Sequence, residues 1–200
     1  MQGVGGQIVR RVQGRGRGSV WTPSDFLDLG TRAAVDQALK RLVQKGVLQR
    51  VDRGIYSYPK VSPRIGPLSP SPDDVARAVA KSTGSKVQVA GARAANALGV
   101  STQVPAKSVY LTDGPSRKVR VGRQMVHLKH ASARDLVGVG TRAGLAFQAI
   151  RYLGPDGVDS RTARQMAAQL NDSDRKQLKR AKRRAPGWLR PIVDRVTDLK

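Results

Sequence analysis

Residues 31–58 decide the fold: Thr31-Arg-Ala-Ala-Val-Asp-Gln-Ala-Leu-Lys-Arg-Leu-Val-Gln-Lys-Gly46 is followed directly by Val47-Leu-Gln-Arg-Val-Asp-Arg-Gly-Ile-Tyr-Ser-Tyr58. The first part predicts an amphipathic helix, because its apolar residues recur at i, i+3, i+4, i+7 and i+8. Thr31 suits the N-cap of this helix, and Gly46 suits its end. The second part predicts two strands joined by a tight turn at residues 52–54.

The residues before this stretch add two more helices. A short helix is expected over residues 7–13, a short strand at 20–21, and a helix that starts at Thr22-Pro23 and stops at Gly30. Three helices followed at once by a hairpin is the element order of a winged helix-turn-helix. We therefore expect residues 1–60 to form such a domain and to bind duplex DNA.

The polar face of the helix that follows Thr31 carries side chains that suit DNA. Arginine can pair with a guanine edge and glutamine with an adenine edge, whereas lysine suits phosphate. Two arginines near the hairpin turn would face the DNA backbone or the minor groove. The predicted DNA-binding residues are Thr31, Arg32, Gln37, Lys40, Arg41, Lys45, Arg50 and Arg53. The plainer interpretation is a solvated helix face beside an ordinary hairpin.

The composition favours a polyanionic partner. The 200 residues include 37 Lys and Arg against 14 acidic residues, for a net charge of +23, and every acidic residue is Asp. Part of this excess is what high-GC codon usage would produce. There is no Cys, which excludes disulfides and thiolate zinc sites. Without a long apolar stretch or a signal-peptide pattern, a cytoplasmic protein with no membrane association is expected.

Five prolines between Pro59 and Pro72 predict a break in the chain. We expect a winged-helix domain over 1–60, a Pro-rich linker over 61–72 and a second domain over 73–200. The second domain is predicted to be α+β. It would hold a small antiparallel sheet, with residues 108–112, 117–121 and 124–130 as a meander, and a helical C-terminus. The whole chain is therefore assigned to the α+β class.

Two further basic stretches stand out. Seven of the ten residues in 175–184 are basic, and Lys179, Arg180, Arg183 and Arg184 are candidates for a second phosphate-binding surface. A solvated helix face explains this stretch equally well. The predicted sheet carries its own bases, which would suit an RNA-binding protein: Arg117, Lys118, Arg120, Arg123 and Lys129.

Most of the chain resembles a known family, and the likeness is strongest over residues 19–59. Three segments are similar to the N-terminal region of AbiEi-type antitoxins of type IV toxin–antitoxin systems: residues 19–30, residues 34–46 and residues 48–59. The most telling part is Leu48-Gln-Arg-Val-Asp-Arg-Gly-Ile-Tyr56. The strand-plus-helix unit at 86–98 and Ala185-Pro-Gly-Trp-Leu189 add to the likeness. The resemblance implies a cytoplasmic antitoxin that represses its own operon and counteracts a nucleotidyltransferase-like toxin.

No enzyme chemistry is predicted. His127 and His130 are three apart in an expected strand, so they point to opposite faces and are poor partners for one metal. The paired aspartates at 73–74 and at 172 and 174 lie where helices begin and suit capping. We expect no catalytic residue, metal or cofactor. Two alternatives stay open: a stand-alone regulator whose second domain dimerises or senses a ligand, and an RNA-binding protein. A homodimer stays open too.

Overall fold

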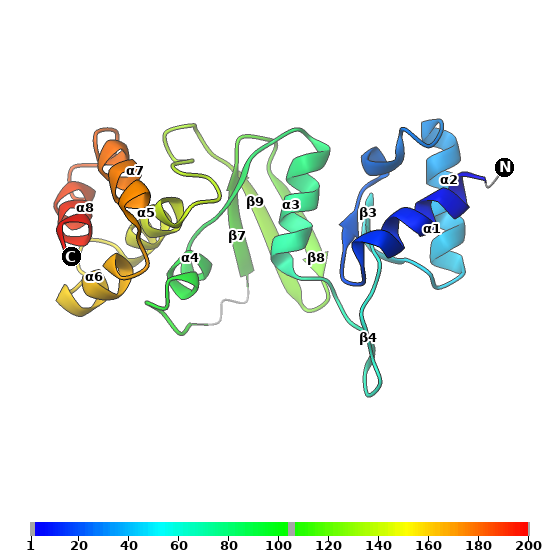
Figure 1. Ribbon diagram of the computed structural model, residues 1–200, viewed down its shortest axis with the longest axis horizontal. Helices are drawn as coiled ribbons and strands as arrows, with labels where there is room; N and C mark the ends of the chain where they lie inside the picture. The colour runs from blue at the N-terminus through cyan, green and yellow to red at the C-terminus, as the bar shows by residue number, and fades with distance from the viewer. Residues whose placement is uncertain (1–2, 104–106, 200) are drawn as a thin grey trace. The chain divides into compact units, whose positions relative to one another are not determined.

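The N-terminal part of the chain is a winged helix-turn-helix, as its apolar pattern predicts (Figure 1). The computed structural model describes residues 3–103 and 107–199. In chain order the domain consists of α1 (Val4–Arg15), β1 (Val20–Trp21), the 3-10 helix η1 (Pro23–Phe26), α2 (Arg32–Gln44), β2 (Gln49–Asp52) and β3 (Ile55–Ser57). The three strands form an antiparallel sheet in the order β1-β3-β2.

One apolar cluster holds these elements together. Ile8 of α1, Phe26 of η1, and Val35 and Leu39 of α2 are fully buried in it. Trp21 stacks on Phe26 with ring centroids 5.2 Å apart. The predicted helix over 22–30 is wrong in length, because only Pro23–Phe26 is helical. The segment closes with a short-range hydrogen bond from the Leu29 amide to the Phe26 carbonyl at 3.0 Å, so no full α-turn forms.

The chain divides into two compact units at places other than the predicted linker. One unit runs to Gly84 and also includes Lys118–Val126, and the other holds Ser85–Arg117 and the residues from His127 onward. The Pro-rich stretch forms a two-stranded hairpin of β4 (Val61–Ser62) and β5 (Gly66–Pro67). The helix after it, α3 (Pro72–Ser82), packs against β1 and β3 and so belongs to the first unit.

The strands between residues 87 and 130 form a four-stranded sheet. They are β6 (Val87–Val89), β7 (Lys107–Thr112), β8 (Arg117–Val121) and β9 (Gln124–His130). Their order is β6-β7-β9-β8, and β6 pairs antiparallel with β7. The predicted meander is therefore wrong, because the long β9 lies between β7 and β8 and leaves β8 at an edge.

The C-terminal part is a helical cluster, as expected. It contains α4 (Ala92–Ala97), α5 (Arg142–Leu153), α6 (Ser160–Ala167), α7 (Asp172–Lys182) and α8 (Leu189–Asp198). Their buried side chains form one core that includes Ile150, Met166, Leu178 and Val193. Polar side chains cap three of these helices; the Asp174 carboxylate, for example, takes part in the capping box that opens α7. The α+β layout with a helical C-terminus is confirmed.

Candidate nucleic-acid interface

Helix α2 presents a continuous polar face to solvent. Val35, Ala38, Leu39 and Leu42 turn into the core and Val43 packs against it, so the polar side chains lie on the opposite face. The exposed polar residues are Thr31, Arg32, Gln37, Lys40, Arg41, Gln44 and Lys45. The Thr31 hydroxyl accepts a hydrogen bond from the Ala34 amide at 3.3 Å, so it caps the helix as predicted. The helix has the length and the side chains to enter a major groove.

Two contacts along α2 orient its long side chains. The Arg32 guanidinium donates to the Asp36 carboxylate at 2.8 Å, which offsets its charge at the start of the helix. The Arg41 guanidinium donates to the Gln37 amide oxygen at 3.2 Å. Gln37 and Arg41 are therefore neighbours on the exposed face, one turn apart, and their remaining donors face solvent.

The hairpin after α2 has the geometry of a wing. Residues 53–54 make a two-residue turn between β2 and β3, and Gly54 adopts φ +70°, which favours glycine. Arg50 and Arg53 are both exposed. The wing therefore presents both predicted arginines at its surface.

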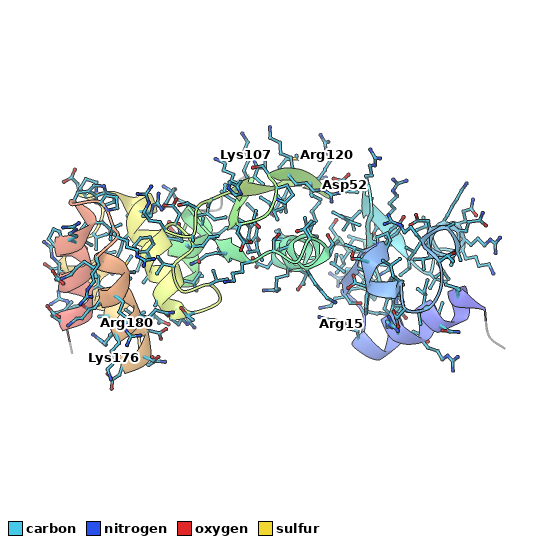
Figure 2. All side chains as sticks on the ribbon, turned by 90° about the horizontal axis from the view of Figure 1, so that it is seen from above. Arg15, Asp52, Lys107, Arg120, Lys176 and Arg180 are labelled. Atoms are coloured by element: carbon cyan, nitrogen blue, oxygen red, sulfur yellow. The ribbon has the colours of Figure 1, made fainter. Side chains whose placement is uncertain are left out.

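The carboxylate of Asp52 connects the wing to a distant part of the same unit. One oxygen accepts the Arg53 amide at 2.6 Å, and the other accepts the Arg120 amide at 3.1 Å. Asp52 and Arg120 are labelled near one another in Figure 2. The hairpin made by residues 118–126 thus lies beside the wing, although Asp52 and Arg120 are 68 residues apart in sequence.

This second hairpin carries its own exposed bases. Val119 and Val121 are buried, and the alternation of the strand turns Lys118 and Arg120 to the other side, where they are exposed. Arg123 is exposed in the turn that follows. The sequence marks these residues as a basic strand, but only the folded structure places them next to the wing. The other two sheet bases, Arg117 and Lys129, belong to the second unit.

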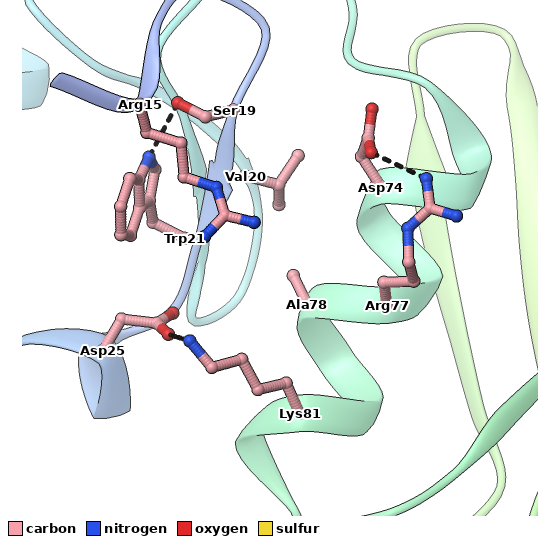
Figure 3. Close-up of a pocket in the computed structure, with 9 residues that line it drawn as sticks. All are labelled: Arg15, Ser19, Val20, Trp21, Asp25, Asp74, Arg77, Ala78 and Lys81. Atoms are coloured by element: carbon pink, nitrogen blue, oxygen red, sulfur yellow. Dashed lines mark hydrogen bonds and ion pairs between the residues drawn. The ribbon is translucent and has the colours of Figure 1, made fainter. Parts of the chain in front are cut away.

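Helix α3 is attached to the winged helix by an ion pair beside a small pocket (Figure 3). The pocket measures about 120 Å³ and is lined by Trp21, Ala78 and charged side chains. The Lys81 ammonium contacts the Asp25 carboxylate at 2.6 Å. Burial alone would raise the pKa of Asp25, but hydrogen bonds from Lys81 and Thr22 outweigh it and lower the pKa. Arg15 lies 5.6 Å from the Trp21 ring centroid. The contact between Lys81 and Asp25 thus attaches α3 to the winged helix.

The basic helix α7 is less open than its sequence indicates. The Lys179 ammonium pairs with Asp198 at 2.7 Å, and that of Lys182 pairs with Asp194 at 2.6 Å. The Arg175 guanidinium is partly buried and donates to three backbone carbonyls. The bases of this stretch that remain exposed without such a contact are Lys176, Arg180, Arg183 and Arg184. Of the four predicted residues, Lys179 is therefore committed to an ion pair on α8.

The remaining observations concern metal-ligating side chains and long helices in residues 3–103 and 107–199. No group of three or more His, Cys or acidic residues there could hold a metal ion. The His130 ring nitrogen Nδ1 contacts the Gly114 carbonyl at 3.0 Å, next to a turn. In residues 3–103 and 107–199, no helix has both the length and the apolar character needed to span a membrane.

The helix order, the β1-β3-β2 sheet and the exposed polar face of α2 define a winged helix-turn-helix protein within an α+β chain. Residues 7–178 match the family described as "Family of unknown function (DUF6088)", and the chain belongs to this family. It is similar to the crystal structure of the RV2827C protein from Mycobacterium tuberculosis, at 16% identity and a TM-score of 0.49. That match covers 98% of this chain and 76% of the other. No curated protein matches the chain in sequence.

Proposed function

We propose that this protein binds duplex DNA, with α2 in the major groove and the wing on the adjacent backbone. One observation carries the proposal: a winged helix whose exposed α2 face pairs Gln37 with Arg41 and continues into an arginine-bearing wing. Arginine and glutamine are the side chains that read guanine and adenine edges, so this face suits sequence recognition. Lys40 and Lys45 suit phosphates on either side.

The hairpin of residues 118–126 widens this surface. Because the Asp52 carboxylate holds the Arg120 amide beside the wing, Lys118, Arg120 and Arg123 add positive charge at that place. Side chains of this type on strands and turns contact phosphates and position a protein on the duplex. We assign them to the DNA backbone, with sequence reading left to α2.

We further propose that the protein is a cytoplasmic antitoxin of the AbiEi type, which represses its own operon and counteracts a nucleotidyltransferase-like toxin. The support is the resemblance of residues 19–30 and 48–56 to that family, together with a winged helix of the kind such a repressor needs. The second unit would carry the neutralising activity. A gene for a nucleotidyltransferase-like protein beside this one is the expected genomic setting.

The experiment that tests DNA binding is a competition measured by fluorescence anisotropy. The full chain is mixed with a labelled duplex from its own promoter, and unlabelled promoter duplex, unrelated duplex or double-stranded RNA is added. We expect the promoter duplex to compete best and the RNA to compete worst. Equal competition by all three would contradict the proposal, since it would reflect only the +23 charge.

An RNA-binding protein is the second candidate, because exposed basic residues lie on the hairpin of residues 118–126 and at Lys129. A sheet that binds single-stranded RNA usually stacks bases on exposed aromatic rings. Among Phe, Tyr and Trp, the strands β7, β8 and β9 contain one residue, Tyr110, and it is buried; the exposed ring of His130 contacts the Gly114 carbonyl through Nδ1. This observation favours duplex DNA. Single-stranded RNA is added as a further competitor in the same assay, and stronger competition by it than by promoter duplex would favour the RNA-binding function.

A further inference from the structure

We propose that the second unit contains a binding site for a phosphate group, formed by three arginines around one pocket. The pocket measures about 430 Å³ and opens between the loop before α5, the helix α5 itself and the end of the basic stretch after α7. Arg134 lines it from the loop, Arg151 from α5, and Arg184 from the basic stretch. This site is separate from the surface assigned to duplex DNA.

The charge in this pocket is not balanced. The carboxylate of Asp135 is the acidic group in the lining, and it forms an ion pair with Arg151. Within the described residues, Arg134 and Arg184 form no ion pair, although the Asp135 carboxylate also attracts Arg134 electrostatically, and both arginine side chains are exposed. Three guanidinium groups against one carboxylate leave two positive charges facing the same space. A phosphate monoester carries close to two negative charges at neutral pH, so it matches this excess.

Two parts of the pocket lining are held in place by contacts within the second unit: the loop at residues 132–135 and the side chain of Arg151. The Ser132 hydroxyl donates to the Asp135 carboxylate at 2.8 Å, and the buried Gln148 amide donates to the Asp135 carbonyl at 2.7 Å. The loop that carries Arg134 is therefore fixed on α5. The Arg151 guanidinium lies 6.0 Å from the ring centroid of Phe147, which is only 2% exposed.

Arginine is the side chain best suited to this ligand. Its planar fork donates two parallel hydrogen bonds to phosphate oxygens, and its charge does not depend on pH. A pocket of about 430 Å³ is in the range that holds a small organic ligand, so the phosphate can belong to a nucleotide. The same group also occurs at the end of a nucleic-acid strand. The chemistry recognised is the phosphate in both cases.

Isothermal titration calorimetry of the full chain tests the site. The probes are inorganic phosphate, adenosine 5′-monophosphate, adenosine, and a short single-stranded oligonucleotide with or without a 5′-phosphate. We expect the phosphate-bearing probes to bind and adenosine not to bind. If the mononucleotide binds as tightly as the phosphorylated oligonucleotide, the source is a free nucleotide. If only the phosphorylated oligonucleotide binds tightly, the source is a strand end.

The double variant Arg134→Gln/Arg184→Gln ties binding to the pocket. Its matched control, Arg161→Gln/Arg164→Gln, removes two exposed charges from α6 in the same unit. We expect the first variant to bind adenosine 5′-monophosphate at least about tenfold more weakly and the control to stay within about twofold of wild type. Thermal melts confirm that both fold. Absence of phosphate-dependent binding, or an equal loss in both variants, would overturn the proposal.

Discussion

Arg175 lies in the most basic stretch of the chain, yet its guanidinium has a structural role. It donates to the carbonyls of Thr197 and Leu199 at the end of α8, and to that of Ala167 at the end of α6. Helix ends leave such carbonyls without partners, so this one side chain satisfies acceptors from two helices. Its neighbour Lys176 has no such contact and is exposed.

Replacing Arg175 by Ala is expected to lower the free energy of unfolding by about 2–3 kcal/mol, because it leaves carbonyls with charge-assisted bonds unsatisfied. The matched change Lys176→Ala is expected to stay within about 0.5 kcal/mol of wild type. Urea denaturation followed by circular dichroism measures both. Equal stability of the two variants would show that the Arg175 contacts contribute nothing.

For single residues, the sequence predicts features that depend on neighbouring positions but not contacts between residues far apart in the chain. The bounds of α2 were predictable within about a residue, because Thr31 and the glycine at position 46 mark its ends. The role of Arg175 was not, because its partners Thr197 and Leu199 lie 22 and 24 residues away. The pairing of Lys179 with Asp198 is hidden for the same reason.

At the scale of elements, Asp25 couples η1 to α3 through Lys81. The pKa of Asp25 is lower in the folded protein than in the unfolded chain, so its contribution to stability is complete above about pH 4. As the pH falls through the folded pKa, the carboxylate becomes protonated in both states and the contribution disappears. The attachment of α3 to the winged helix is therefore expected to weaken in acid.

Asp25→Asn isolates this contribution from the other carboxylates. At pH 7 the variant is expected to be less stable than wild type by about 1–3 kcal/mol, since it loses charged hydrogen bonds to Lys81 and Thr22. Near pH 2 the difference is expected to shrink toward zero. Urea denaturation at both pH values gives the comparison. A difference that stays constant with pH would rule out a role for the Asp25 charge.

The hairpin of residues 118–126 gives a second prediction at this scale. Changing Lys118, Arg120 and Arg123 together to Gln is expected to weaken duplex binding and to flatten its salt dependence. Each lost phosphate contact should reduce the slope of log affinity against log salt concentration by about 0.9. The control changes Arg161, Arg164 and Lys176 to Gln, which removes the same charge from the second unit. If both triple variants changed duplex affinity and its salt dependence equally, the hairpin would make no specific contact with DNA.

The position of this hairpin shows the limit of reasoning from local pattern. The sequence predicts a strand at residues 117–121, and the structure confirms it, with Val119 and Val121 buried and Lys118 and Arg120 exposed. The pattern does not encode which strand lies beside which. The edge position of β8 and its contact with Asp52 depend on pairing between distant segments, and the simple meander was therefore wrong.

At the scale of the whole molecule, positive charge is spread over both compact units. The proline content of 59–72 indicates a break, whereas the division into units falls after α3, because α3 packs on the winged helix. Composition predicts a polyanionic partner but not where each unit would bind one. The fold class was predictable because it follows from the element order.

The antitoxin proposal makes a prediction about α7. When the neighbouring nucleotidyltransferase-like gene is co-expressed, wild-type protein is expected to restore growth. Reversing Arg180 and Arg183 to Glu is expected to abolish protection with little cost in stability, because both side chains are exposed. Circular dichroism checks the fold of the variant. Full protection by the folded variant would remove α7 from the neutralising surface, and failure of the wild-type protein to protect would contradict the antitoxin role.

The most direct test of the central claim, that α2 reads the sequence of a DNA duplex, is the affinity of Gln37→Ala/Arg41→Lys for two duplexes. This variant keeps the net charge but removes the amide and the planar fork from the exposed face. By fluorescence anisotropy, affinity for the chain's own promoter should fall by about 1–3 kcal/mol, roughly 5- to 150-fold. Affinity for a scrambled duplex should stay unchanged. Wild-type affinity for the promoter, or an equal fall on both duplexes, would contradict the account.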